Sequence, residues 1–190
     1  MLDLNLVIEI ISVVLSLAFL ILLMRENIWC WSFGIVSSLL SIYLFIEAKL
    51  YSESILYLFY AVMGVYGWWV WNQQKGGVMP VKKWPIKKSL IAFGAGLGIA
   101  AGLGVYFKNY SDAESPFIDA TTTSFSFLAT YMEAHKVLSA WMYWIAINAT
   151  SIWLYQSRGL RIYSLLMLAY AALSVLGLYR WNKQFKSQVI

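Results

Sequence analysis

Apolar residues gather along this chain in seven long runs, separated by short segments richer in glycine, proline and charged residues. The runs lie at about residues 6–24, 28–46, 54–72, 89–107, 117–134, 137–156 and 160–180. A transmembrane helix needs roughly 20 consecutive apolar residues, and each run is close to that length. Only the run at about 117–134 is notably polar. The pattern predicts an all-α integral membrane protein with seven transmembrane helices in a single membrane domain, residues 1–190.

The composition agrees with this pattern and excludes most soluble classes of protein. Hydrophobic residues make up 61% of the 190 residues and charged residues only 12%, against roughly 25% charged residues in a typical soluble domain. In water such a chain would expose a large apolar surface. The net charge of +5 does not indicate nucleic-acid binding, because the basic residues lie between the apolar runs and not on one face.

Several kinds of chemistry are excluded by single residues and motifs. Cys30 is the one cysteine and His135 the one histidine, so the sequence predicts neither a disulfide framework nor a metal site. No phosphate-binding G-x-x-x-x-G-K-[ST] loop is present, and no Ser/His/Asp order indicates a hydrolase. We therefore expect neither an enzyme nor a bound cofactor. The first apolar run follows Asp3 and not a basic segment, so we interpret it as a retained helix and not as a signal peptide.

Basic residues are distributed unequally between the two sides of the predicted stack of helices. The side with the C-terminal tail has ten: Arg25, Lys75, Lys82, Lys83, Lys87, Lys88, Lys136, Arg180, Lys183 and Lys186. The other side has four: Lys49, Lys108, Arg158 and Arg161. Because basic loops tend to stay in the cytoplasm, we expect a cytoplasmic C-terminus and an external N-terminus. Tryptophans near the ends of the runs are typical of a membrane interface: Trp29, Trp31, Trp68, Trp71 and Trp181.

An offset of 110 residues aligns two parts of the chain with each other. Residues 31–74 match residues 141–184 without a gap, with 16 of 44 positions identical, and both copies end in G-x-x-x-W-N-x-Q. We interpret this as two three-helix repeats, at about 5–74 and 117–184, joined by a connector helix at about 89–107. The offset spans four helices, which predicts parallel repeats such as those of SWEET-type sugar transporters. Coincidental similarity between two apolar segments is the alternative.

The fifth run carries a continuous polar stripe at helical spacing. Its members are Asp119, Thr122, Thr123, Ser126, Thr130 and Glu133. Polar groups inside a membrane are costly unless they face a partner or a water-filled pathway, so the stripe indicates a transport pathway. The alternative is that the hydroxyls bond to their own backbone and that the two acids lie at the membrane interfaces. A thinner stripe of Glu9, Ser12 and Ser16 runs along the first helix.

The sixth run places aromatic and amide side chains on one helical face. They are Trp141, Trp144, Asn148, Ser151 and Tyr155. Two indoles one turn apart suit a planar, preferably cationic ring through stacking and cation–π attraction, and the amide suits hydroxyl or carboxamide groups. The alternative is an interfacial tryptophan pair with a helix-packing asparagine. The candidate substrate-binding residues are Trp141, Trp144, Asn148, Asp119, Thr122, Thr123, Ser126 and Tyr155.

Three motifs give the chain a family resemblance. They are N-I-W-x-W-x-F-G-I at 27–35, G-W-W-V-W at 67–71 and W-x-x-W-I-x-x-N at 141–148. Together with the order of the helices, they resemble the PnuC family of bacterial vitamin transporters over nearly the whole chain. The resemblance implies a seven-helix SWEET-like fold in the bacterial inner membrane, often as a homotrimer. It also implies import of nicotinamide riboside by facilitated diffusion, with intracellular phosphorylation trapping the substrate.

The resemblance also implies substrate contacts at Trp141, Trp144 and Asn148, and it leaves the substrate open. Relatives that carry thiamine or riboflavin share the scaffold, and thiamine is also a flat cation with a hydroxyl group. The first repeat has Trp31, Gly34 and Ser38 at the matching positions, so we expect an asymmetric site.

Glycines in the connector helix recur every four residues, at Gly94, Gly98 and Gly102. A G-x-G-x-x-A match there resembles a nucleotide-binding fingerprint, but it lies inside an apolar run without a preceding strand. We expect this face to pack closely against another helix.

Overall fold

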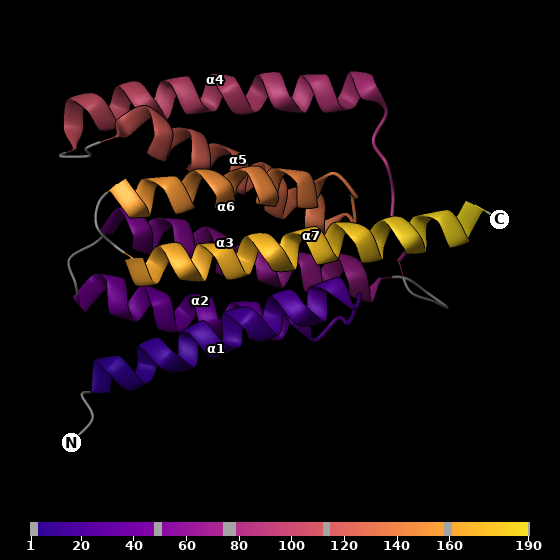
Figure 1. The fold of residues 1–190 in the computed structure, drawn as a ribbon, viewed down its shortest axis with the longest axis horizontal. Coiled ribbons are helices and arrows are strands. Elements are labelled where there is room, and N and C mark those ends of the chain that lie inside the picture. The colour runs from indigo at the N-terminus through magenta and orange to yellow at the C-terminus, as the bar shows by residue number, and fades with distance from the viewer. Residues whose placement is uncertain (1–3, 48–50, 74–78, 112–114, 158–160, 190) are drawn as a thin grey trace. The chain divides into compact units, whose positions relative to one another are not determined.

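The computed structural model describes residues 4–47, 51–73, 79–111, 115–157 and 161–189. Within them the chain forms seven α-helices, which confirms the all-α prediction (Figure 1). They are α1 (Leu4–Met24), α2 (Cys30–Glu47), α3 (Tyr51–Asn72), α4 (Ile86–Tyr110), α5 (Pro116–Ala134), α6 (Ala140–Ser157) and α7 (Arg161–Val189). The charged residues Lys49, Lys75 and Arg158, used to orient the chain, lie outside the described residues.

Five of the seven helices are long and apolar enough to cross a membrane. The qualifying segments are Leu4–Met24, Cys30–Glu47, Glu53–Asn72, Ile86–Tyr110 and Ser164–Gln188. The remaining two, α5 and α6, have 19 and 18 residues but carry the hydroxyl, amide and tryptophan side chains noted above. The two helices outside this group are therefore the two that hold the candidate site.

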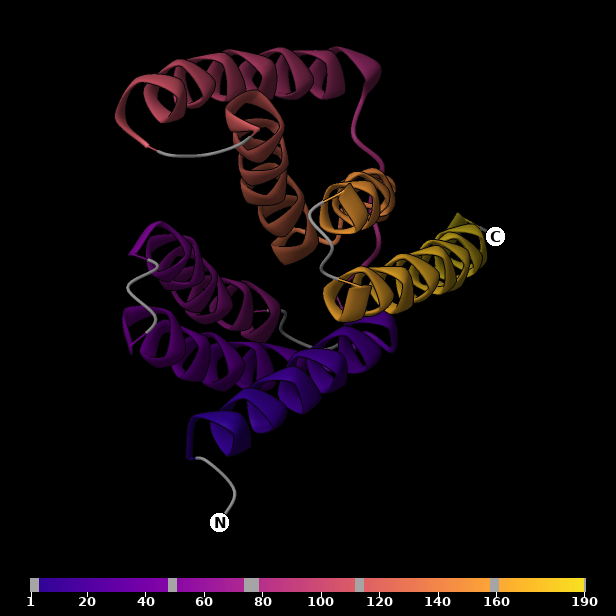
Figure 2. The same cartoon turned by 60° about the vertical axis from the view of Figure 1, so that its left-hand side comes forward.

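Contacts divide the chain into two compact units, Met1–Pro80 and Val81–Ile190. In the first unit α2 packs against both α1 and α3. In the second unit α4 packs against α5, α5 against α6, and α6 against α7. The helix α4 crosses α5, and α6 lies beside α7 (Figure 2). The helix α4, which is expected from the sequence to be a connector, thus packs directly on α5.

Serine hydroxyls join α1 to α2 in the first unit. Ser12 Oγ lies 2.7 Å from Ser41 Oγ, and Ser37 Oγ donates to the Ser12 carbonyl oxygen at 2.9 Å. All three serines are buried. The thin polar stripe of the first helix therefore serves, at Ser12, to hold two helices together, because a hydrogen bond between helices satisfies polar groups that lipid cannot.

Glycines of α4 pack against α5, but not the glycines expected from the sequence. A Cβ atom at Gly96 would lie 2.8 Å from the Phe125 ring, and one at Gly104 would collide with Phe117. Ser124 Oγ also donates to the Gly96 carbonyl oxygen at 2.7 Å. The expected face of Gly94, Gly98 and Gly102 was wrong for this contact: a Cβ there meets no described atom within 4 Å. Phe125 and Phe117 of α5 instead contact the face of α4 that carries Gly96 and Gly104, two residues along from the expected glycines.

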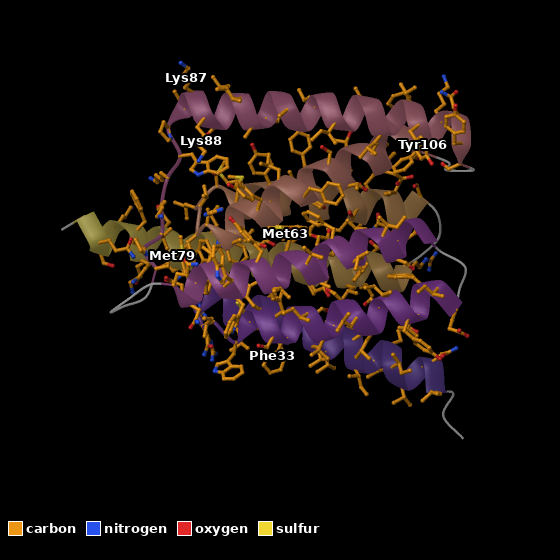
Figure 3. The ribbon with its side chains drawn as sticks, turned by 180° about the vertical axis from the view of Figure 1, so that it is seen from behind. Phe33, Met63, Met79, Lys87, Lys88 and Tyr106 are labelled. Carbon is orange, nitrogen blue, oxygen red and sulfur yellow. The ribbon has the colours of Figure 1, made fainter. Side chains whose placement is uncertain are left out.

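The segment before α4 pairs with the turn between α5 and α6. The Lys82 amide donates to the Lys136 carbonyl oxygen, and the Leu138 amide donates to the Lys82 carbonyl oxygen, each at 2.8 Å. Lys88 Nζ lies 4.2 Å from the centre of the Trp84 ring. Figure 3 shows Lys87 and Lys88 together at the start of α4. This pairing gathers basic side chains at one end of the second unit.

The ends of the helices follow the 110-residue offset closely. The bounds of α2, Cys30–Glu47, become those of α6, Ala140–Ser157, when 110 is added. The left-handed residues in the preceding turns, Glu26 with φ 57° and Lys136 with φ 50°, also differ by 110. The two segments therefore have similar local backbone geometry, which the aligned identities alone did not require.

Buried tryptophans correct the expectation of an interfacial belt. Trp29 and Trp68 are exposed, as such a belt requires. Trp31, Trp71 and Trp181, by contrast, are at most 7% exposed and pack inside their units. The Trp31 ring lies against Gly67 of α3, while Trp71 packs on Trp31 and Trp181 packs on Trp141.

Candidate functional site

Two helices of the second unit, α5 and α6, carry the candidate residues. Pro116 is the first residue of α5, where its fixed φ suits the first turn and its missing N–H is not needed for a helical hydrogen bond. The helix ends at Ala134, and a tight turn through Lys136 leads into α6 at Ala140. This short connection makes α5 and α6 direct neighbours.

The polar stripe of α5 becomes more buried along the helix. Asp119, Thr122 and Thr123 are half-buried, whereas Ser126, Thr130 and Glu133 are buried. Asp119 lies in the first turn, where a carboxylate favours the positive end of the helix. Fourteen residues separate Asp119 from Glu133, which is about 21 Å along a helix. The two acids therefore lie at opposite ends of α5.

Some hydroxyls of the stripe bond to their own helix, as the packing alternative expects. Thr122 Oγ1 donates to the Asp119 carbonyl oxygen at 3.0 Å, and Thr130 Oγ1 donates to the Ser126 carbonyl oxygen at 2.8 Å. Within the described residues, the Thr123 and Ser126 hydroxyls form no such bond. Thr123 and Ser126 are thus the hydroxyl members of the stripe best suited to a ligand.

Trp141 faces α7 and is fully buried. Its ring packs edge to face against Trp181, with centroids 5.3 Å apart, and a Cβ atom at Gly177 would lie 2.5 Å from the same ring. The first unit repeats this contact, because Trp31 meets Trp71 at 5.5 Å and lies over Gly67. Trp141 and Trp31 therefore occupy equivalent packing positions in the two units.

Trp144, one turn later, lies against α5. Its half-buried ring packs on the apolar cluster of Phe125, Ala129 and Ile147. Its side chain also lies next to the Glu133 carboxyl group. The structure thus directs the two indoles to different helices, so they do not form one continuous aromatic surface.

Asn148 joins α6 to α7. The side chain is 5% exposed, and its Nδ2 donates to Ser174 Oγ at 3.3 Å. Ser174 in turn donates to the Tyr170 carbonyl oxygen at 2.8 Å. This chain orients the amide and leaves its carbonyl oxygen as the group to consider for a ligand. Ser151 and Tyr155, further along the same face, are half-buried.

Glu133 is the residue that the sequence-based list of candidates omitted. It is 1% exposed, and its Oε1 is buried without a hydrogen-bond partner in the described part of the chain. The polar stripe contained Glu133, but the candidate substrate-binding residues did not include it. The 110-residue offset carried a clearer signal, since it pairs Glu133 with Leu23.

The described residues contain no group of three His, Cys, Asp or Glu side chains placed to hold a metal ion. The chemistry of the site consists instead of aromatic, hydroxyl, amide and carboxyl groups. None of the residues of α5 or α6 is lysine or arginine. The arrangement can bind a small polar or cationic molecule, and it supplies no pair of groups for bond cleavage.

Comparisons with known proteins point to one family. The sequence model of the nicotinamide mononucleotide transporter family matches residues 6–183. The nicotinamide riboside transporters PnuC of Escherichia coli (strain K12) and Shigella flexneri are each 23% identical over 196 residues, covering 88% of this chain and 82% of the relative. A crystal structure of the vitamin B3 transporter PnuC matches with a TM-score of 0.77 and 20% identity, covering 95% of this chain and 82% of that one.

The fold and the family model agree over nearly the whole chain, so the resemblance seen in the tryptophan motifs is confirmed. The match begins in α1 and ends in α7, and it includes both helices of the candidate site. This chain belongs to the nicotinamide mononucleotide transporter family and is a multi-pass membrane transporter, not an enzyme.

Proposed function

We propose that this transporter carries nicotinamide riboside by facilitated diffusion, with Trp144, Asn148 and the polar face of α5 lining its site. The observation that carries the proposal is the character of α5 and α6. These helices combine indole, amide, hydroxyl and carboxyl groups, and they contain no basic residue. Such a surface suits a pyridinium ring with an uncharged sugar.

Charge favours the riboside over the mononucleotide named in the family description. A mononucleotide adds a phosphate, which proteins normally bind with Arg, Lys or a helix N-terminus. The site helices offer two acids, Asp119 and Glu133, and no cation. A phosphate next to these carboxylates would be repelled, whereas the positively charged pyridinium ring of the riboside would be attracted.

The roles of the candidate residues differ in this proposal. Trp144 provides the aromatic contact, while Asn148, Thr123 and Ser126 provide hydrogen bonds. Trp141 acts indirectly, because its ring fixes α6 against α7 at Trp181. Asp119, Thr122 and Tyr155 line the remainder of the pathway.

Thiamine is the second substrate to consider. It is also a flat cation with a hydroxyl group, and an aromatic contact such as that of Trp144 would suit it as well. It differs from the riboside in having a single hydroxyl and no carboxamide. A site that holds several hydroxyl groups would reject it.

Transport requires no energy source within the chain. No P-loop is present, and uptake would be drawn inward when a separate kinase phosphorylates the substrate. The phosphorylated product could not return through a site that repels phosphate. The charge of the site therefore supports both selectivity and trapping.

We further propose that the protein lies in a bacterial cytoplasmic membrane with its C-terminus inside, as the excess of basic residues on that side indicates. The two three-helix repeats would be parallel, as in SWEET-type transporters. The shared helix bounds of α2 and α6 support a duplication. Cysteine labelling at Lys186 and Lys108, from the two sides of the membrane, would test the orientation.

We propose a homotrimer as the assembly. The face of α4 with Gly94, Gly98 and Gly102 is exposed in the second unit, and small residues at this spacing let helices approach closely. The mass of the purified protein in detergent, measured by light scattering, would give the number of protomers. A monomeric mass would contradict the proposal.

A competition experiment tests the substrate. Purified protein would bind labelled nicotinamide riboside, and unlabelled riboside, mononucleotide, thiamine and riboflavin would be added in turn. We expect the riboside to compete at least about tenfold better than the others, because only it matches both ring and hydroxyl groups. Stronger competition by thiamine or by the mononucleotide would reject the riboside as the substrate.

A further inference from the structure

Two buried polar atoms on neighbouring helices of the second unit have no hydrogen-bond partner in the described residues. They are Glu133 Oε1 on α5 and Trp144 Nε1 on α6, both unpartnered within the described residues. Glu133 is 1% exposed, and its carboxyl group lies next to the Trp144 side chain. The two atoms nevertheless do not meet the distance and angle of a hydrogen bond with each other.

Such an arrangement is costly for the empty protein. Buried polar groups are hydrogen-bonded in nearly all structures, because leaving one unpaired forfeits its bonds to water. Among the described residues three buried tryptophan N–H groups have no hydrogen-bond partner, and those of Trp31 and Trp141 occupy equivalent packing positions in the two units. The unpaired Trp144 N–H and Glu133 oxygen, by contrast, have no counterpart in the first unit, so the packing common to both units does not account for them.

The first repeat shows that the fold does not need this pair. The position equivalent to Glu133 is Leu23, which is also fully buried. The position equivalent to Trp144 is Gly34, and the space above it is filled by the Phe19 ring. At these two positions the first unit therefore has apolar groups only, namely Leu23 and the Phe19 ring over Gly34.

The exchange of residues between the copies preserves volume and adds polarity. Phe19 on α1 corresponds to Ala129 on α5, and Gly34 on α2 corresponds to Trp144 on α6. The large ring is therefore on the first helix of the pair in the first unit and on the second helix of the pair in the second unit. The indole that replaces the phenyl ring brings an N–H donor. The carboxyl group that replaces leucine brings an acceptor. Both changes occur at one place, which indicates a ligand and not a packing requirement.

We propose that Glu133 and Trp144 together hold one hydroxyl group of the transported molecule, and hence its sugar. A hydroxyl oxygen can accept from Trp144 Nε1 while its own hydrogen is donated to Glu133 Oε1. An ammonium group could only donate, and a carbonyl group could only accept, so neither satisfies both atoms through one atom. This inference rests on the proposed carriage of a riboside and names the part of the riboside that this pair recognises.

The test uses nicotinamide riboside and its three analogues that each lack one ribose hydroxyl, at the 2′, 3′ or 5′ carbon. Binding of each to the purified protein is measured by competition with labelled riboside. We expect one analogue to bind about 10- to 100-fold more weakly than the riboside, because a buried partner that loses its hydroxyl is left unpaired.

Variants then assign that loss to the pair. Glu133→Leu copies the residue that the first repeat holds at this position, and Trp144→Phe keeps an aromatic ring while removing the N–H. In each variant the riboside should bind no more than about threefold better than the sensitive analogue. Glu133→Gln keeps an acceptor oxygen and should retain most of the preference. Controls are Glu47→Gln and Trp153→Phe, both at exposed positions, and they should retain all of it.

Each outcome decides between the two proposals. If the wild-type protein binds the riboside but accepts all three analogues within about threefold, the hydroxyl site is rejected and the carriage of a riboside stands. Unchanged preference in both Glu133→Leu and Trp144→Phe also rejects the hydroxyl site. Wild-type protein that binds no riboside rejects both. Thermal unfolding of each variant shows whether it is folded. If Glu133→Leu or Trp144→Phe does not fold, the binding of the three analogues to Glu133→Gln decides whether the hydroxyl site stands.

Discussion

The ring of Trp141 meets that of Trp181 edge to face, with centroids 5.3 Å apart and an interplanar angle of 88°. The same contact occurs 110 residues earlier, between Trp31 and Trp71, at 5.5 Å and 87°. Edge-to-face aromatic pairs add stability beyond the area that they bury. The pair therefore ties α2 to α3 in the first unit and α6 to α7 in the second unit.

Gly177 is expected to be intolerant of a side chain. A Cβ atom there would lie 2.5 Å from the Trp141 ring, and overpacking of this kind costs about 1–3 kcal/mol. Gly177→Ala should therefore lower the temperature of unfolding in detergent. Leu176→Ala is the control, because Leu176 precedes Gly177 on the same helix and is 50% exposed, so truncating its side chain leaves no buried cavity. Equal unfolding temperatures for the two variants would contradict the packing.

Trp141→Phe should reduce stability more than binding. The ring is fully buried against α7, so a smaller ring leaves a cavity that costs on the order of 1–3 kcal/mol. Riboside affinity of the folded protein should change by less than about threefold. The measurement pairs thermal unfolding with a binding isotherm on the same preparation. Lost binding at unchanged stability would instead make Trp141 a direct substrate contact.

Ser174→Ala should weaken substrate binding through Asn148. The Ser174 hydroxyl accepts from the Asn148 amide, and a hydrogen bond between membrane helices contributes about 0.6 kcal/mol on average, which corresponds to about a threefold change in affinity. Thr150→Ala serves as the control, since that hydroxyl bonds to its own helix at Ala146. An unchanged affinity for the riboside in Ser174→Ala would show that this bond does not position the amide.

His135 is expected to make stability depend on pH. Burial, followed by the positive charges of Lys82 and Lys88, lowers the pKa of His135 from its usual 6.5. As pH falls below about 6.5, the unfolded chain takes up a proton before the folded protein does, so the free energy of unfolding decreases until the folded pKa is passed. Wild-type protein should lose more stability than His135→Asn between pH 7.5 and 5.5, as measured by thermal unfolding. Parallel curves for the two proteins would rule out this contribution.

The helices could be predicted closely from the sequence because lipid imposes a simple rule on length and polarity. Each expected run begins within three residues of the corresponding helix. Only α7 extends clearly further, to Val189, since no glycine or proline follows Arg180 to end it. The left-handed residues Glu26 and Lys136 also lie 110 residues apart, but the aligned identities did not predict these turns.

The candidate site could be located on α5 and α6 but not resolved into contacts. Helical spacing placed Trp141 and Trp144 on one face, yet α7 takes the first indole and α5 the second. The predicted packing face of α4 differs from the observed one for a similar reason, because Phe125 on α5 packs against Gly96. Periodicity tells which residues share a face, and only the neighbouring helix decides which of them are covered.

Uptake of labelled nicotinamide riboside into liposomes that contain only this protein tests the central claim most directly. With no nucleotide and no ion gradient, we expect the internal concentration to rise to that outside and to stop there. A soluble riboside kinase with ATP inside the liposomes should then drive accumulation beyond that level. Accumulation without the kinase that collapses when a proton ionophore is added would contradict passive carriage.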